Sequence, residues 1–366
     1  MSLSKTRFGI IGCGVIAPWH ADAISGLDEA ELTAVCDCIP EKAEKMAQEY
    51  GARAYDNYHD LLASTDVDAV CICTPSGMHA DMAIDAARAG KHILSEKPID
   101  INLDKIDLMI QECRKAGVKL GCIFQRRTSP LWRELKDAVE CNALGKMVLG
   151  DIYLKYYRSQ KYYDSGGWRG TWALDGGGAL INQGVHMVDI LQWIMGPITS
   201  LYGRADHLVR NIETEDTAVA VVTFANGAFG VIQGTTSVYP GMKHRLELHG
   251  EQGTILVEGE KLLKWEVEGQ ECKTSSEDGQ GGVDIKLGTA ETPPTPNRIR
   301  GHQLQILDLI QAIREDRDPM VNGEEARKSV EIILAIYESA RTGRPVEFPL
   351  RTSSEMADEC RIGTSG

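Results

Sequence analysis

The sequence lacks three features, and each absence excludes a class of protein. Its 10 cysteines contain no C-x-x-C pair, the spacing typical of a zinc or redox site. No apolar run approaches the roughly 18 residues that a membrane span requires. Basic residues are in deficit, 39 against 53 acidic ones, and the net charge of −14 opposes nucleic acids and anionic membranes as partners. A small anionic substrate is not excluded, because a site can be locally positive.

The cysteines are expected to behave as small buried apolar residues. Cys36 and Cys38, and again Cys71 and Cys73, lie two positions apart in apolar segments, where side chains share one face of a strand. No histidine or third cysteine lies at ligand spacing, so we expect no metal and a reduced, cytoplasmic environment. The chain enters a predicted strand almost at once, which leaves no room for a signal peptide.

Predicted strands and helices alternate along the first 124 residues. Strands are predicted at 7–11, 31–37, 69–73, 91–95 and 118–123, and helices at 16–26, 40–49, 58–63, 78–89 and 102–116. This order is typical of an α/β fold, a doubly wound parallel sheet with helices on both faces, as in a Rossmann domain. The 366 residues allow about two domains, and we place the first at 1–124.

An apolar run at 8–11 leads into a G-x-G-x-x-A turn and then a predicted helix. Gly12 permits the tight turn, Gly14 lets a diphosphate approach the main chain, and Ala17 lets the helix pack near the strand. The N–H groups and the dipole of the helix N-terminus favour the anion. Glycine-rich turns are common, so the prediction depends on the strand before, the helix after and the acid that ends the next strand.

That acid is Asp37, which closes the predicted strand 31–37. A carboxylate there can accept hydrogen bonds from both hydroxyls of an adenosine ribose and repels a 2′-phosphate. The pattern therefore favours NAD over NADP. The alternative is a capping aspartate between a strand and the helix that opens at Pro40.

Two further strand ends carry residues suited to a ligand site. Thr74 and Pro75 follow the strand 69–73, and ligands of open parallel sheets lie beyond the carboxyl ends of the strands. We expect both residues to line the cofactor path. His79 opens the next helix, where it either contacts a ligand or only caps and packs the helix.

Lys97 stands in Glu96-Lys97-Pro98, directly after the predicted strand 91–95. At the carboxyl edge of the sheet its ammonium can donate to a substrate hydroxyl and stabilise a developing alkoxide. The alternative is a surface lysine on a loop, and the triplet by itself does not decide between the two.

The pattern changes after Phe124. A helix is predicted at 130–141, strands at 146–157, 199–207, 215–225, 228–237, 243–249, 253–258 and 262–267, and helices at 299–315 and 323–342. These elements predict a second, α+β domain at 125–350 with a large, mainly antiparallel open sheet, whose apolar face is a natural oligomer interface. Residues 270–298 predict a long polar loop, and 351–366 a loosely held tail.

Three glycines at 176–178 open a predicted helix that carries Asn182, His186 and Asp189. Positions i, i+4 and i+7 share one helix face, and apolar residues fill the other faces. The glycines allow a ligand or the other domain to approach the main chain closely. A polar stripe in this setting favours a catalytic histidine over a satisfied core histidine.

These motifs together resemble those of the glucose–fructose oxidoreductase and myo-inositol dehydrogenase family (Gfo/Idh/MocA). The matching features are the G-x-G-x-x-A turn, Thr74-Pro75, Glu96-Lys97-Pro98, Trp168-Arg169-Gly170, the triple-glycine helix with His186, and Arg344-Pro345-Val346. The resemblance implies a Rossmann domain, then an α/β domain with an open sheet, and a homodimer or homotetramer formed through that sheet.

The resemblance also implies an NAD-dependent dehydrogenase for a sugar, polyol or nucleotide sugar. In it Lys97 would be the catalytic lysine and His186 the general acid/base. Many relatives carry Asp where this chain has Asn182, which cannot take a proton. A branch similar to the nucleotide-sugar 3-dehydrogenases also has Asn there, which favours such a substrate over free inositol. Arg127 and Arg169 are candidate anchors for a substrate carboxylate or phosphate.

The candidate residues form two sets. The cofactor-binding candidates are Gly12, Gly14, Val15, Ile16, Asp37, Thr74, Pro75, His79, Glu96, Lys97 and Gln125, and the substrate-binding candidates are Lys97, Arg127, Trp168, Arg169, Asn182 and His186. Two other functions stay open: an NAD-dependent glycosidase with transient ring oxidation, and a non-catalytic NAD-binding regulator. The presence of both Lys97 and His186 argues against the regulator.

Overall fold

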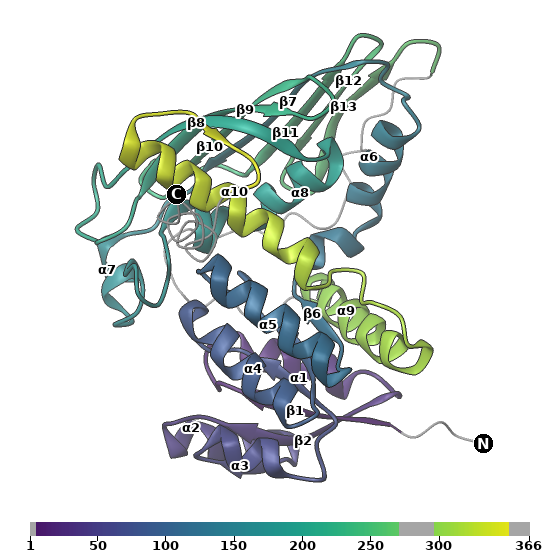
Figure 1. Ribbon diagram of the computed structural model, residues 1–366, viewed down its shortest axis with the longest axis vertical. Coiled ribbons are helices and arrows are strands. Elements are labelled where there is room, and N and C mark those ends of the chain that lie inside the picture. Colours follow the sequence, from purple (N-terminus) through teal and green to yellow (C-terminus); the bar gives the residue numbers. More distant parts are fainter. Residues whose placement is uncertain (1–4, 271–295, 351–366) are drawn as a thin grey trace, which may run out of the picture. The chain divides into compact units, whose positions relative to one another are not determined.

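The computed structural model describes residues 5–270 and 296–350 (Figure 1). They belong to two compact units: unit 1, Met1–Thr128 with Ala290–Arg327, and unit 2, Ser129–Thr289 with Lys328–Gly366. This division differs from the predicted domains, because a late segment of the chain packs with the first unit. The predicted loop at 270–298 and tail at 351–366 lie almost wholly outside the described residues.

Unit 1 contains a six-stranded parallel sheet in the order β3-β2-β1-β4-β5-β6, which confirms the Rossmann prediction. Its strands are β1 Thr6–Ile11, β2 Ala30–Cys36, β3 Arg53–Tyr55, β4 Ala69–Ile72, β5 His92–Ser95 and β6 Leu120–Cys122. Its helices include α1 Ala17–Ser25, α2 Pro40–Tyr50, α3 Tyr58–Ala63, α4 His79–Arg88, α5 Leu103–Ala116 and α9 Pro296–Glu315. Strand β3 was not predicted.

Local sequence explains the ends of several of these helices. The side chains of Asn57 and Asn102 accept main-chain N–H bonds and cap α3 and α5. Gly51 and Gly117 end α2 and α5 in the left-handed conformation. All four residues of β4 are buried, as expected for a central strand covered on both faces. Cys38 is exposed just beyond β2, so the prediction that it is buried beside Cys36 was wrong.

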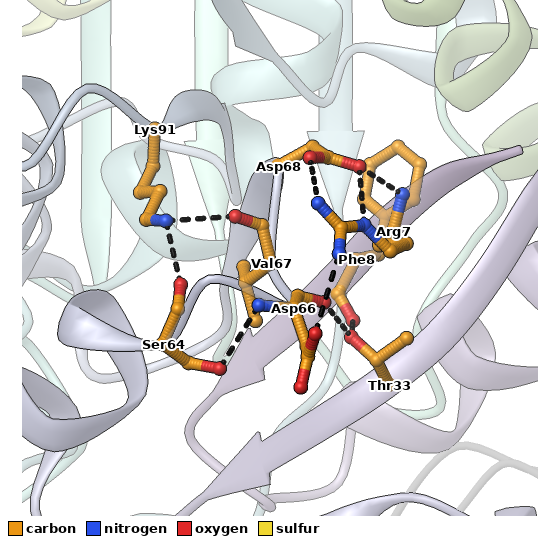
Figure 2. Close-up of polar contacts among 8 residues, drawn as sticks. All are labelled: Arg7, Phe8, Thr33, Ser64, Asp66, Val67, Asp68 and Lys91. Atoms are coloured by element: carbon orange, nitrogen blue, oxygen red, sulfur yellow. Dashed lines mark hydrogen bonds and ion pairs between the residues drawn. The ribbon is translucent and has the colours of Figure 1, made fainter. Parts of the chain in front are cut away.

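Ion pairs and hydrogen bonds fasten the amino edge of this sheet (Figure 2). The guanidinium of Arg7 on β1 lies 2.7 Å from Asp68, which directly precedes β4. The ammonium of Lys91 donates to the carbonyl oxygens of Ser64 and Val67, at 2.8 Å each. These contacts tie β1 and β5 to the loop before β4. The opposite, carboxyl edge carries the candidate ligand residues.

Helix α9 belongs to unit 1 because its apolar side completes the core there. Ile306, Leu309 and Ile310 are fully buried in a cluster that includes Phe8 of β1 and Ile24 of α1. The helix begins at Pro296, three residues before the predicted start.

Unit 2 contains an eight-stranded mixed sheet in the order β13-β12-β11-β7-β10-β9-β8-β14. Among the described strands of this sheet, only β7 and β10 pair in parallel; the other neighbours are antiparallel, as predicted. The strands are β7 Met147–Lys155, β8 Ile198–Asp206, β9 Thr217–Phe224, β10 Phe229–Thr235, β11 Arg245–Gly250, β12 Gly253–Glu258, β13 Lys261–Val267 and β14 Val346–Glu347. The short β14 was not predicted.

Unit 2 also contains helices, some of which pack on one face of this sheet. They are α6 Pro130–Glu140, α7 Gln160–Asp164 and α8 Val185–Met195, together with most of α10 Gly323–Thr342. The main chain of Gly203 on β8 donates to Ser339 of α10, at 2.9 Å. On β9, Ala218, Ala220 and Val222 are buried while Val219 and Val221 alternate onto the uncovered face. No described helix combines the length and apolarity that crossing a membrane would need.

Candidate active site

The two glycines of the first turn differ in their surroundings. Gly12 has φ +95°, donates its N–H to Cys36 at 2.7 Å, and a Cβ there would lie 2.8 Å from the carbonyl oxygen of Cys73. A Cβ on Gly14 would meet no atom within 4 Å. Gly12 is therefore required by the turn itself, whereas Gly14 borders open space that a ligand can enter.

Helix α1 presents its N-terminus next to this space. No side chain among the described residues caps it, and its first turn contains no acidic residue. Val15 and Ile16 form the turn that leads into the helix, and Ala17, its first residue, is fully buried. The main-chain N–H groups and the positive end of the helix dipole thus remain suited to a diphosphate.

Asp37 lies beside the same turn, directly after β2. Its two carboxylate oxygens accept the main-chain N–H groups of Cys13, at 2.8 Å, and Ile39, at 2.9 Å. These bonds fix a half-buried carboxylate next to the glycines. A carboxylate oxygen can accept further hydrogen bonds, so contact with an adenosine ribose stays a prediction.

His79 joins two loops at the carboxyl edge of the sheet. Its ring nitrogens lie 2.8 Å from the carbonyl oxygen of Pro98 and 2.9 Å from that of Thr74, and the residue is 1% exposed. The structure thus gives His79 a packing role that connects the ends of β4 and β5. Its contact with a cofactor stays a prediction, as does that of Thr74 and Pro75.

Glu96 is buried at the end of β5, where its carboxylate lies 2.8 Å from the Nε2 atom of His20 on α1. The main-chain N–H of Lys97 donates to the other carboxylate oxygen, at 3.1 Å. Gln125 follows β6 at the same edge, and its buried Oε1 atom has no hydrogen-bond partner among the described residues. An unsatisfied acceptor there fits a site that receives a ligand with an N–H donor.

Arg127, a predicted substrate anchor, is buried within unit 1. Its guanidinium lies 2.9 Å from Glu325 of α10. This ion pair connects the segment after β6 to the beginning of α10, within unit 1. A role in substrate binding stays a prediction.

In unit 2, Asn182 and His186 lie on consecutive stretches of different helix type. Residues Ala179–Gly184 form a π-helical segment that contains Asn182, and His186 lies in the first turn of α8. Both are partly exposed, whereas Asp189 is fully buried. The predicted polar stripe therefore ends at His186. The wider π turn shifts Asn182 relative to the spacing of a regular helix.

A buried carboxylate orients Asn182. The side-chain amide of Asn182 donates to Asp175, at 2.5 Å, and the main chain of Gly170 donates to the other oxygen of Asp175, at 2.8 Å. Gln183 donates to the amide oxygen of Asn182, at 2.7 Å. The amide is thus fixed from two sides.

Two arginines lie against Tyr162 in the same network. The guanidinium carbon of Arg169 is 4.5 Å from the ring centre of Tyr162 and 4.7 Å from that of Trp168. That of Arg158 is 5.2 Å from Tyr162, and Arg158 also donates to Gln183, at 2.8 Å. Arg158 was missed by the sequence analysis; its only signal was a basic residue just after a predicted strand.

Neither guanidinium pairs with a carboxylate among the described residues, and the buried Nε atoms of Arg158 and Arg169 have no hydrogen-bond partner there. Two half-buried cations without a counter-ion favour the binding of an anion. This pair gives the candidate substrate site two positive charges.

The glycines at 176–178 have a different role from the predicted one. A Cβ on Gly177 would overlap the hydroxyl of Tyr337, and a Cβ on Gly178 would overlap the main-chain oxygen of Glu215. These contacts lie inside unit 2, so the close approach that requires glycine is made by this unit's own residues. The close approach of a ligand or of the other domain to these glycines stays a prediction.

Comparison with known proteins agrees with these features. The family described as "Oxidoreductase family, NAD-binding Rossmann fold" matches residues 6–124, and its "C-terminal alpha/beta domain" matches residues 136–348. The chain belongs to the Gfo/Idh/MocA oxidoreductase family. The resemblance found from the sequence motifs is confirmed.

Several relatives in this family are named dehydrogenases. The myo-inositol 2-dehydrogenase of Thermotoga maritima is 28% identical, over 93% of this chain and 98% of that protein. The WlbA dehydrogenase of Bordetella pertussis, solved with NADH and UDP-GlcNAcA, is 35% identical and covers 95% of this chain and 100% of its own, with a TM-score of 0.83. The WlbA dehydrogenase of Chromobacterium violaceum, solved with the same two ligands, is 33% identical, covers 96% and 98%, and has a TM-score of 0.85.

The chain is thus an NAD-dependent sugar or polyol dehydrogenase. Its residues fit the cofactor on three points: the open space at Gly14, the uncapped N-terminus of α1 and the unsatisfied oxygen of Gln125.

Proposed function

We propose that this enzyme oxidises a secondary alcohol on a sugar ring that carries a negative charge, such as a nucleotide-linked sugar uronate. The observation that carries the proposal is the pair of guanidinium groups of Arg158 and Arg169, which flank Tyr162 without a carboxylate partner among the described residues. A carboxylate or phosphate on the substrate would supply the missing charge through bidentate hydrogen bonds.

The two WlbA dehydrogenases support this substrate class, because both were solved with UDP-GlcNAcA and exceed 30% identity over nearly the whole chain. Asn182 supports the same substrate class, because an amide held by Asp175 can orient ring hydroxyls but cannot take up a proton. Neutral inositol, the substrate named for the Thermotoga maritima relative, needs no cationic pair. None of these three relatives is a glycosidase or a regulator.

We assign the chemistry to Lys97 and His186. NAD, when bound, would supply the acceptor for the hydride of the carbinol carbon. His186 takes the hydroxyl proton, since an imidazole titrates near neutral pH. The ammonium of Lys97 donates to the same oxygen and stabilises the alkoxide as it forms. Asn182 orients the ring hydroxyls, and Arg158 and Arg169 hold the anionic group. The free energy of binding thereby helps to align the carbinol carbon with the reacting groups.

The first test of the proposed chemistry is NADH formation, followed by absorbance, with purified protein and NAD across free sugars, polyols, uronates and UDP-linked sugars. We expect turnover with an anionic sugar and loss of turnover in Lys97→Ala. The matched control is Lys105→Ala, an exposed lysine that pairs with Asp81 on the surface. A Lys97→Ala enzyme that retained the wild-type rate would remove Lys97 from the mechanism.

The second test concerns the anion site. Arg158→Ala should raise KM for the anionic substrate by about tenfold or more, because a hydrogen bond to a charged group contributes about 1.5–3 kcal/mol. The rate with any neutral sugar that is turned over should change little. Arg88→Ala, at an exposed arginine of α4 that pairs with Glu112, is the control. An equal loss for neutral and anionic substrates would contradict the assignment.

We also propose that the enzyme is a homodimer or homotetramer formed through the uncovered face of the eight-stranded sheet, and that it works in the cytoplasm. The exposed apolar side chains of β9 and β10, including Val219, Val221 and Phe229, support the first part. The acidic net charge supports the expectation that neither nucleic acid nor a membrane is a partner.

A further inference from the structure

The loop that carries Lys97 is held on both sides by buried histidines from other segments of unit 1. His20, on α1, contacts Glu96 just before the lysine. His79, on α4, contacts the carbonyl oxygen of Pro98 just after it. His20 and His79 are 0% and 1% exposed, so water does not compete for either contact.

The buried carboxylate of Glu96 contacts two histidines and one main-chain N–H group. Its Oε1 atom lies 2.8 Å from Nε2 of His20 and 3.5 Å from Nε2 of His302 on α9. Burial alone would raise the pKa of Glu96, but the hydrogen bond from His20 and the nearby ring of His302 hold it well below its usual range. The carboxylate is therefore ionised at neutral pH. Its second oxygen accepts the main-chain N–H of Lys97, at 3.1 Å.

The protonation of His20 follows from its surroundings. Burial lowers the pKa of His20, although Glu96 opposes this shift. A neutral ring that donates from Nε2 to Glu96 leaves Nδ1 without a proton. The Nδ1 atom has no hydrogen-bond partner among the described residues, which agrees with this tautomer. His20 thus acts as a fixed donor to the carboxylate.

The spacing does not suit a metal ion, although two histidines and a carboxylate are a ligand set that zinc uses. Two ligands at the usual zinc distances stand about 3.3 Å apart in a tetrahedral site. Nε2 of His20 and Oε1 of Glu96 are 2.8 Å apart, which is the length of a hydrogen bond. The cluster is a hydrogen-bonded support for the loop.

We propose that His20 is a positioning residue for Lys97 and acts through Glu96. The inference rests on the proposed function, in which the ammonium of Lys97 contacts the reacting oxygen. The bond from His20 fixes one carboxylate oxygen of Glu96 and so aims the other at the main chain of Lys97. Without this donor the carboxylate can turn, and the lysine loses one of the contacts that set its place. A misplacement of about 1 Å is enough to cost roughly 100-fold in rate.

The experiment compares His20→Leu with His20→Gln, because the amide nitrogen of glutamine can occupy the place of Nε2 and donate to Glu96. We expect His20→Leu to lower kcat about 100-fold, with little change in KM or in the affinity for NAD, and His20→Gln to recover most of kcat. The control is His59→Leu, an exposed histidine of α3. Thermal unfolding of all three variants separates loss of folding from loss of positioning.

A second readout is independent of turnover. An amine-reactive reagent labels lysines, and peptide mass spectrometry gives the labelling rate of each one. The rate at Lys97 should change in His20→Leu and return toward the wild-type value in His20→Gln, while the rate at Lys105 stays unchanged. If the wild-type protein turned over no sugar, the proposed function would fail while this labelling result still tested the positioning. Equal kcat values for the leucine variant and the wild type would overturn the inference. So would leucine and glutamine variants that were equally slow and equally destabilised.

Discussion

Gly12 and Gly14 stand two residues apart in one turn, yet the physical reasons for glycine differ. The main chain of Gly12 is left-handed and packs against Cys73, whereas nothing among the described atoms borders the missing side chain of Gly14. One glycine thus serves the fold, and the other borders open space that we predict the cofactor to enter. A pair of alanine substitutions separates these two roles.

Gly12→Ala should destabilise the protein by about 1–3 kcal/mol, because alanine at this φ is strained and its Cβ would press on the carbonyl of Cys73. Gly14→Ala should unfold at the wild-type temperature without NAD, but bind NAD about tenfold or more weakly, since its Cβ enters the diphosphate space. Thermal unfolding and calorimetric titration with NAD measure both effects. A Gly14→Ala variant with full NAD affinity would show that the cofactor does not approach this turn.

At the scale of elements, one buried carboxylate holds the start of the helix that carries the candidate catalytic histidine. Glu215 accepts the main-chain N–H groups of Gly178 and Leu180, at 2.9 and 2.8 Å, and the hydroxyl of Tyr337, at 2.8 Å. Burial raises the pKa of Glu215 to about 7, although these three donors favour the ionised form. The entry into the π-helical segment and α8 therefore depends on a group that titrates near neutral pH.

The raised pKa has a consequence for stability. A carboxyl group that holds its proton more tightly in the folded than in the unfolded chain stabilises the folded state when it is protonated. This stabilisation is complete at pH values below 4.5, the ordinary pKa of the group. This contribution, about 3 kcal/mol, is lost as the pH rises through about 7. Glu215→Gln cannot titrate, so the fall in unfolding temperature between pH 5 and pH 8 should be smaller in this variant than in the wild type. The exposed Glu251→Gln is the control, and identical slopes for Glu215→Gln and the wild type would contradict the prediction.

The elements that sequence patterns predicted are those whose own residues specify them. Helix α3 was predicted without error, because Asn57 caps it locally, and the alternation of β9 marks a strand with one buried face. The strands β3 and β14 are three and two residues long and contain no run of buried residues, unlike β6, which is equally short but buried throughout. The π-helical turn at 179–184 depends on Glu215 and Tyr337, which lie far away in the sequence, so local spacing could not predict it.

In the candidate site, too, the sequence predicted only those contacts that local residues specify. Gly12, Gly14 and Asp37 lie near one another in the sequence and follow a known spacing, so their geometry could be predicted. The pairing of Arg158 with Gln183, and that of Glu96 with His20 and His302, join segments that are distant in the sequence. Such contacts appear only once the chain is folded.

At the scale of the whole molecule, the division of the chain follows burial and not sequence order. Residues 290–327 return to unit 1 because the apolar side of α9 needs cover, and α1 and β1 supply it. A truncation that ended unit 1 at residue 128 would expose Ile306's partners in the core, among them Ile24 and Phe8. An isolated NAD-binding unit therefore has to include α9.

The uncovered face of the eight-stranded sheet sets the last prediction. Val221 on β9 is 55% exposed and lies opposite Tyr202 of β8 and Val231 of β10, while Phe229 on β10 is 61% exposed and lies beside Leu149 of β7. An apolar surface of this extent on one sheet face favours association with a second copy. A charge placed in such an interface would be buried without a partner, which costs several kcal/mol.

Val221→Glu should therefore shift the protein toward single chains of 40.1 kDa, as measured by light scattering after size exclusion, with the fold intact by circular dichroism. Leu108→Glu places the same charge on α5 of unit 1, at a leucine that is 43% exposed, and should leave the mass unchanged. If the wild-type protein already has the mass of one chain, the sheet is not a self-association surface. If Leu108→Glu dissociates the oligomer and Val221→Glu does not, the interface lies on unit 1.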